Sequence, residues 1–356
     1  MGNATDLRAA LPASHHPARQ ALLERFDAMG WPTRKHPAWH YTDLGRLPPS
    51  GWQPLPDLGR DIAPAAAEDG DHFALLNAAF APPAERLSAD GHLPGRDVAA
   101  GAMDHLQFTA SLSQGEQALR VIDDDRRIDG LRTRWGTLAL AADSQLDLVW
   151  ISRGEGTGHD LARLTANVAR GAQLRLWVLA MGTATVRLEG DIHLDDEGAQ
   201  ADIHALSLPR QQGALDLPLT LHHHAPHGHS RAWLRAIGLD RTRTSFNGRV
   251  VVHEGAVKTD SEQHMASLLL STKAEINAKP DLEIYNDDVK CAHGASFGQL
   301  DDDALFYLRA RGLDHDTAHA LLTRAFAAEI LDTLPDAALR TQVGERMLAQ
   351  LGEALT

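Results

Sequence analysis

Cys291 and His293 are the residues whose types and spacing point most directly to chemistry. Cys291 is the chain's single cysteine, His293 lies two residues beyond it, and Lys290 precedes it. On a strand, residues two apart project from the same face; a thiolate beside an imidazole suits a soft or borderline metal such as iron or zinc, and the Lys290 ammonium would favour the thiolate. Two ligands cannot complete a tetrahedral site, so the others would come from another chain or from sulfide. On chemistry alone, a lone buried cysteine that packs as a small apolar side chain is the commoner case.

A second pattern matches a hydrolase motif. Gly294, Ser296 and Gly298 fit G-x-S-x-G, the strained turn that exposes a nucleophilic serine between a strand and a helix. The region before this motif alternates as β over many strands, and Gln299 to Asp301 interrupt the chain before a helix begins. We therefore favour an ordinary turn of small residues, and a β-solenoid hydrolase that uses this serine stays an alternative.

Histidine is the third residue type with chemical potential. The chain has 20 histidines, and five of them lie close together, at His222, His223, His224, His227 and His229. Adjacent histidines on a strand point to opposite faces, so consecutive ones cannot all bind one metal unless they lie in a loop. We expect a solvated polar loop here rather than a metal site.

A long all-β region must position these residues. Alternation with period two begins at about Leu119 and continues for some 180 residues, whereas residues 82–106 show almost no period and are expected to be loop. Three similar stretches begin at Ser144, Ala172 and Ala199, which lie 28 and 27 residues apart. A fixed period in this range is typical of stacked supersecondary units, so we favour a β-solenoid with about two short strands per turn over an ordinary sandwich.

Helices are expected on both sides of the solenoid. Apolar residues recur at helical spacing from His16 to Met29, and Phe73 to Phe80 is a short apolar helix candidate. Asp301 to Asp303 would cap a helix that ends near Gly312, and two further helices follow to about residue 351. The predicted organisation is an N-terminal helical and loop region (1–105), a β-helix core (106–299) and a C-terminal helical domain (300–356).

Composition excludes several classes of function. The 356-residue chain is 43% hydrophobic and 23% charged, as is typical of globular proteins. Its formal net charge of -14 disfavours nucleic acid and anionic lipid as partners. One cysteine, no N-terminal secretory pattern and no long apolar run predict a cytoplasmic protein without a membrane span. Walker, Rossmann, H-E-x-x-H and C-x-x-C motifs are missing from the sequence, so any ATP chemistry would belong to a partner.

Several motifs in one order make the chain recognisable. It strongly resembles the SufB/SufD family of iron–sulfur cluster assembly proteins, most densely over residues 219–331. An opening motif over residues 30–44 and the single cysteine resemble the SufD branch of that family. The matching segments include Phe246-Asn-Gly248, Lys258-Thr-Asp260, Lys279-Pro-Asp-Leu-Glu283, Asp287-Asp-Val-Lys-Cys-Ala-His-Gly-Ala295, Gly298-Gln-Leu-Asp301, Phe306-Tyr-Leu308 and Arg311-Gly312.

The resemblance implies a fold and a set of partners. Members of this family have a right-handed parallel β-helix between helical ends, which agrees with the repeat in this chain. They act as non-enzymatic scaffold subunits that pair with a SufB-like paralogue through the β-helix and bind a SufC-like ABC-type ATPase through C-terminal helices. We place the ATPase contact at Phe306, Tyr307, Leu308, Arg311 and Gly312.

The resemblance also reverses the interpretation of the cysteine–histidine pair. In the family this segment lies near the SufB–SufD interface, so Cys291 and His293 become candidate metal ligands for a transient iron–sulfur cluster or iron in the complex, with no cofactor tightly bound to the isolated chain. The motif glycines Gly248 and Gly255 are interpreted as turn glycines. Without its partner the chain is expected to form a homodimer, because exposed strand edges can pair with a second copy. A homodimeric interaction module without a metal role stays a further alternative.

Overall fold

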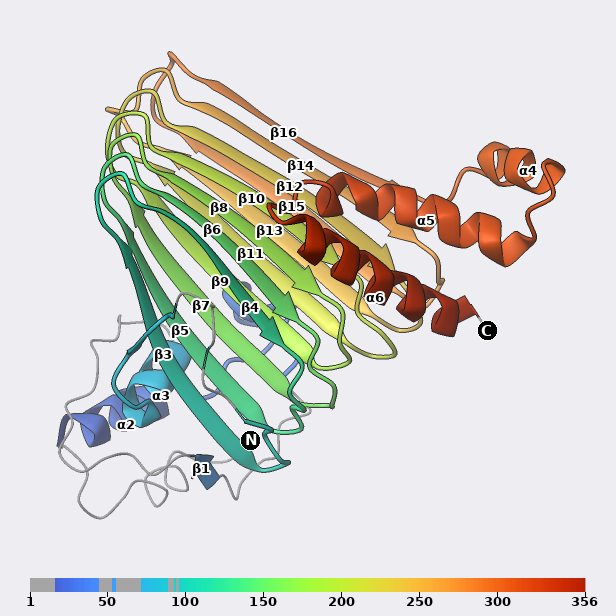
Figure 1. The fold of residues 1–356 in the computed structure, drawn as a ribbon. Coiled ribbons are helices and arrows are strands. Elements are labelled where there is room, and N and C mark those ends of the chain that lie inside the picture. The colour runs from blue at the N-terminus through green and yellow to red at the C-terminus, as the bar shows by residue number, and fades with distance from the viewer. Residues whose placement is uncertain (1–16, 45–52, 56–71, 89–92, 94–95, 356) are drawn as a thin grey trace.

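The computed structural model describes residues 17–44, 53–55, 72–88, 93 and 96–355. Within this part, fourteen consecutive strands form seven turns of a parallel β-solenoid, with two strands in each turn (Figure 1). The predicted β-solenoid flanked by helices is therefore confirmed. The strands are β3 (Ala102–Leu112), β4 (Gln117–Asp124), β5 (Leu131–Leu140), β6 (Gln145–Ser152), β7 (His159–Val168), β8 (Gln173–Ala180), β9 (Thr185–Leu194), β10 (Gln200–Ser207), β11 (Ala214–His223), β12 (His229–Gly238), β13 (Arg243–Val252), β14 (Asp260–Leu269), β15 (Glu275–Ile284) and β16 (Lys290–Gly298).

Two parallel sheets form the walls of the solenoid. The odd-numbered strands from β3 to β15 form one sheet in sequence order, and the even-numbered strands from β4 to β16 form the other. The short strands β1 (Gln53–Leu55) and β2 (Glu85–Arg86) both pair with the outer edge of β3. The three similar stretches of the sequence are β6, β8 and β10, and Gln145, Gln173 and Gln200 pair in register across them. The sequence repeat thus corresponds to one turn of the solenoid.

Strict alternation divides the side chains between an interior core and two outer faces. Along β8, Leu174, Leu176 and Val178 fill the interior, whereas Trp177 and Leu179 point outward beneath C-terminal helices. Trp150 aligns with the residue after Trp177 and therefore points inward. A shift of one residue in register therefore decides whether a tryptophan side chain points into the core or toward the outer face.

The solenoid begins earlier than the sequence pattern indicates. Residues 82–106 were expected to be loop, but they contain β2 and the start of β3. Charged side chains occupy interior positions in the first turns, where Arg132 and Arg134 form ion pairs with Asp124 and Asp160. Burial alone would raise the pKa of Asp124, but the two guanidinium groups lower it to about 2. Asp104, in register with Arg132, is the buried charge at an interior position of β3 within residues 82–106, so this strand lacks the apolar alternation on which the prediction relied.

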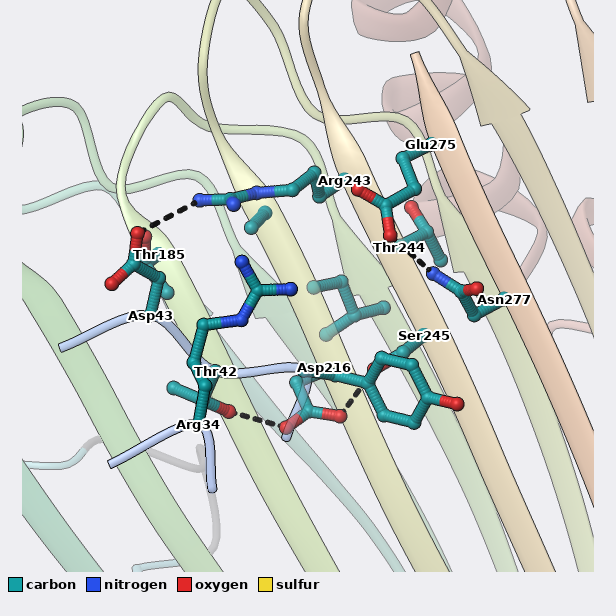
Figure 2. Close-up of a pocket in the computed structure, with 13 residues that line it drawn as sticks. Arg34, Thr42, Asp43, Thr185, Asp216, Arg243, Thr244, Ser245, Glu275 and Asn277 are labelled. Atoms are coloured by element: carbon teal, nitrogen blue, oxygen red, sulfur yellow. Dashed lines mark hydrogen bonds and ion pairs between the residues drawn. The ribbon is translucent and has the colours of Figure 1, made fainter. Parts of the chain in front are cut away.

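N-terminal segments pack on the outer face of the odd-numbered sheet. Helices α2 (Pro17–Met29) and α3 (His72–Phe80) form an apolar cluster with outward residues of β3, β5 and β7, in agreement with the two expected helices, although His16 lies outside the described residues. A 3₁₀ turn, η1 (Pro37–Trp39), places Trp39 against Arg187. The guanidinium carbon of Arg187 lies 4.2 Å from the centre of the Trp39 ring. Figure 2 shows how the next residues dock: the Thr42 and Ser245 hydroxyls both donate to Asp216.

C-terminal helices cover the outer face of the even-numbered sheet. Helices α5 (His315–Leu331) and α6 (Ala337–Leu355) lie across this sheet in Figure 1, and their apolar residues pack on outward residues of β6, β8, β10 and β12. The Trp177 indole donates to the Thr333 hydroxyl at 2.9 Å. The first C-terminal helix, α4 (Asp302–Ala310), begins as expected, because Asp301 accepts hydrogen bonds from the amides of Asp303 and Ala304. None of the helices in the described residues is long and apolar enough to cross a bilayer.

Candidate functional site at the open end of the solenoid

The last turn of the solenoid leaves its strands unpaired on one side. In the described part of the chain, β15 pairs with β13 and β16 pairs with β14, and neither has a neighbour beyond it. No residue from 275 to 298 is buried, although the corresponding positions two turns earlier are mostly core. The interior of the solenoid is therefore open to its surroundings at this end, and two rows of backbone amides and carbonyls lack strand partners.

Cys291 and His293 lie on the interior side of this last turn. Cys291 pairs in register with Ser261, and His293 pairs with Gln263. Cys291 is half-buried and packs against the core, whereas His293 is exposed. The expectation that the two side chains share one face of a strand is confirmed, and their role as ligands stays a prediction.

A buried amide beneath His293 has unused hydrogen-bonding capacity. The Gln263 side chain is only 1% exposed, and neither its amide nitrogen nor its amide oxygen has a hydrogen-bond partner in the structure. A Cβ on Gly248 would lie 2.2 Å from the Gln263 oxygen, so a larger residue there would require the Gln263 side chain to move. Gly248 is therefore a mid-strand residue of β13 rather than the expected turn glycine, whereas Gly255 does lie in a turn. Buried polar groups are usually satisfied, so an unpaired amide at the open end indicates a site for a further group.

A column of polar side chains leads through the interior to Cys291. The His223 ring nitrogen Nε2 lies 2.8 Å from the Ser230 hydroxyl, which lies 2.8 Å from the Ser261 hydroxyl, and Cys291 is next in register. Burial lowers the pKa of His223 to about 4, so its ring is neutral at physiological pH. The interior of these last turns is thus partly polar, in contrast to the leucine-rich interior of β6 and β8.

The Cys291 thiol is held in its protonated form. Burial raises the pKa of Cys291 above its ordinary value, and the Asp260 carboxylate raises it further. Lys290 was expected to favour the thiolate, but it precedes Cys291 on the strand, projects from the opposite face and pairs in register with Asp260. A metal would therefore have to displace a proton from Cys291, and binding would become tighter as pH rises.

The serine of the hydrolase motif is in the wrong surroundings for a nucleophile. Ser296 lies inside β16, not on a turn between a strand and a helix, and its side chain points away from the interior. In the described residues its hydroxyl has no hydrogen bond to a histidine, and its carbonyl accepts from the Ser267 hydroxyl. The geometry gives no support to the hydrolase alternative.

The residues expected to contact a partner ATPase lie on α4 and just after it. The exposed fractions of Phe306 and Tyr307 are 74% and 56%, and none of the residues of α4 is buried. The Arg311 guanidinium lies 4.8 Å from the Tyr307 ring centre, and Gly312 takes a positive φ of 96° that ends the helix. Figure 1 shows α4 projecting beyond the end of α5, away from the solenoid walls. Exposed aromatic side chains on a projecting helix are typical of an interaction surface.

The histidine-rich segment differs from its prediction. His222 and His223 lie on strand β11 rather than in the expected loop, whereas His224 and His227 do lie in the connection between β11 and β12. His223 points inward, while His222 and His224 meet His193 from the preceding turn of the solenoid on the outer face. The local spacing of the histidines does not reveal this contact, because His193 and His222 are 29 residues apart in the sequence.

Comparison with known proteins finds one consistent group of relatives. Residues 110–326 match a family model described as "SUF system FeS cluster assembly, SufBD core domain". The chain is 29% identical to the iron–sulfur cluster assembly protein SufD of Escherichia coli (strain K12), in an alignment that covers 95% of this chain and 93% of that protein. It is 31% identical to an iron–sulfur cluster assembly SufBD family protein of Synechocystis sp., over 67% of this chain and 52% of that protein. The iron–sulfur cluster assembly protein SufD of Bacillus subtilis is 28% identical, in an alignment that covers 49% of this chain and 40% of that protein.

The raised pKa of Cys291 predicts slow alkylation of the folded chain. Iodoacetamide reacts with the thiolate, so labelling at pH 7.5 should be several-fold slower in the native chain than in the urea-unfolded chain. The difference between the two labelling rates should become smaller as pH rises through the pKa of Cys291 in the native chain, because the native thiol then ionises as well. Mass spectrometry of timed samples measures both rates, and Cys291→Ser, which removes the single cysteine, sets the background. Equal rates for native and unfolded chain at pH 7.5 would show that the thiol is not held protonated.

Proposed function

Because the chain belongs to the SufB/SufD family of iron–sulfur cluster assembly proteins and is SufD-like, we propose that it is a non-catalytic scaffold subunit of a SufBCD-type complex. The observation that carries this proposal is the open last turn, which presents Cys291 and His293 beside unpaired strand edges. A nascent iron–sulfur cluster, or its iron, is the cargo of such a complex, and the cytoplasm is the compartment.

The site lacks enough ligands for a cluster, and this supports a paralogous partner. One thiol and one imidazole cannot satisfy a cluster that is normally held by four protein ligands, so a second chain must supply the rest. The exposed edges of β15 and β16 can extend into another parallel solenoid by continued strand pairing, which brings interior residues of the two end turns face to face. A SufB-like paralogue is the partner we propose, and in its absence a second copy of this chain would cover the same edges as a homodimer.

The two proposed metal ligands of this chain, His293 and Cys291, differ in how accessible they are to a metal. His293 is exposed at the open end and can bind through a neutral ring nitrogen, whereas Cys291 is half-buried and protonated. We assign His293 as the ligand shared with the partner and Cys291 as an assisting ligand that becomes available when the end of the solenoid rearranges. The unpaired Gln263 amide lies directly beneath His293, where it can orient that ring or a bound sulfide.

Replacement of the two donors tests the proposal. In a complex reconstituted with the SufB-like and SufC-like proteins of the same genome, we expect His293→Ala to lower cluster content at least tenfold and Cys291→Ser to lower it less. Both variants should still form the complex, because the substitutions leave the strand edges intact. Iron and sulfide analysis with visible absorption measures the cluster, and mass determination after affinity pull-down measures assembly.

Ser296→Ala is the matched control for these variants. It lies on the same strand but points to the opposite face, so cluster content and assembly should be unchanged. If His293→Ala, Cys291→Ser and the double variant all retain full cluster content in an intact complex, the ligand role is wrong and an interaction module without a metal role is favoured. If the wild-type chain does not associate with its paralogue while both are folded, the scaffold proposal itself fails.

We propose that the ATPase subunit docks on α4 through Phe306, Tyr307, Leu308, Arg311 and Gly312. Phe306→Asp should weaken the affinity for the SufC-like protein by about thirtyfold or more, since truncation of a central aromatic anchor typically costs about 2 kcal/mol or more. Leu119 is an apolar residue of β4 at the far end of the solenoid, with an exposed fraction of 36%, and Leu119→Asp should leave the affinity unchanged. Calorimetric titration measures both. An unchanged affinity for Phe306→Asp would place the ATPase elsewhere.

A further inference from the structure

Four histidines gather on the outer face of the odd-numbered sheet, outside the site described above. His193 on β9 pairs in register with His222 on β11, and their rings lie 4.6 Å apart and nearly parallel. His224 follows β11, His253 follows β13, and these two rings lie 4.3 Å apart. The cluster therefore draws one or two imidazoles from each of three successive turns, which places them together without any local sequence motif.

A carboxylate orients two of these rings. One oxygen of Asp191 lies 3.4 Å from Nε2 of His193 and 3.3 Å from Nε2 of His222, and the other oxygen lies 3.2 Å from the Arg163 guanidinium. A carboxylate that accepts a hydrogen bond from Nε2–H fixes the tautomer and leaves the lone pair of the neutral ring on Nδ1.

The remaining ring nitrogens converge. Nδ1 of His193 lies 3.1 Å from Nε2 of His224, and Nδ1 of His222 is buried and makes no hydrogen bond in the structure. One ring nitrogen from each of His193, His222 and His224 can be chosen so that all three lie within 4.8 Å of one another. Two nitrogens bound to one tetrahedral zinc at its usual bond length are about 3.3 Å apart. The nitrogens are therefore close to the spacing that a single cation requires.

We propose that His193, His222 and His224 form a binding site for one divalent transition-metal cation, with Asp191 as the residue that positions His193 and His222. Imidazole ligands select Zn²⁺, Ni²⁺, Cu²⁺ or Fe²⁺ over Mg²⁺ and Ca²⁺. The cation takes the place of the hydrogen bond between His193 and His224, the His224 proton moves from Nε2 to Nδ1, and the stacked rings turn about χ2 to aim at the cation. Side-chain exposed fractions of 27% for His193 and 22% for His222 give the cation access.

The location of this histidine cluster separates it from the site at the open end. The site lies on the outer face of the wall, whereas Cys291 and His293 face the interior of the last turn. The two sites are therefore separate, and the new site does not depend on the scaffold role proposed above.

Zinc titration of the full chain tests this site. After removal of metal with a chelator, the wild-type chain should bind one Zn²⁺ with micromolar or tighter affinity in competition with a chromogenic chelator. His222→Asn and His224→Asn should each weaken binding at least tenfold, and Asp191→Asn should weaken it about 10-fold to 100-fold, as loss of an orienting carboxylate typically does. His229→Asn, an exposed histidine of the same chain segment, should leave binding unchanged.

A second measurement needs no variant. Zn²⁺ should protect His193, His222 and His224 of the wild-type chain from modification by diethyl pyrocarbonate, as read by peptide mass spectrometry, and Co²⁺ should give the absorption bands of a tetrahedral site. Zinc binding should persist in a chain that carries both Cys291→Ser and His293→Ala. The proposal is overturned if the wild-type chain binds no Zn²⁺, if protection appears on other histidines, or if binding is lost with the Cys291 and His293 substitutions.

Discussion

In-register stacking of parallel strands is the constraint on which the rest of this structure depends. Each strand pairs with the strand one turn later without slippage, so a residue lies directly above another that is 26 to 32 positions away in the sequence. A slip of one residue would move every interior side chain to an outer face. The same rule therefore forms the leucine core, the column from Ser230 through Ser261 to Cys291, and the pairing of His193 with His222.

The two ends of the odd-numbered sheet are treated differently. At the first turn, β1 and β2 both pair with β3 and cover its edge, whereas β15 in the last turn has no outer neighbour in the described residues. Soluble proteins usually cover or charge exposed strand edges because such edges pair with other chains. In the other sheet, the last strand β16 carries Cys291 and His293, and the unpaired Gln263 amide lies on β14 beside it. These features support the partner that we propose at this end of the solenoid.

Sequence patterns predicted the features that depend on local order. Alternation and the repeat identified the solenoid, the Asp301 cap identified α4, and a spacing of two placed Cys291 and His293 on one face. Features that depend on distant pairing were missed. The interior charge of Asp104 disguised the first strand, because its register partner Arg132 lies on the next strand of the same sheet, 28 residues away in the sequence. Gly248 was interpreted as a turn glycine, since nothing in its neighbourhood of the sequence indicates the Gln263 side chain that passes beside it.

Hydrogen–deuterium exchange of this chain, alone and bound to its SufB-like paralogue, tests the central claim most directly. The account predicts that complex formation protects the amides of β15 and β16, which have free edges in the isolated chain, while β6 to β10 change little. Protection confined to the outer faces of the walls, with residues 275–298 exchanging as in the free chain, would contradict the claim that the open end is the docking surface.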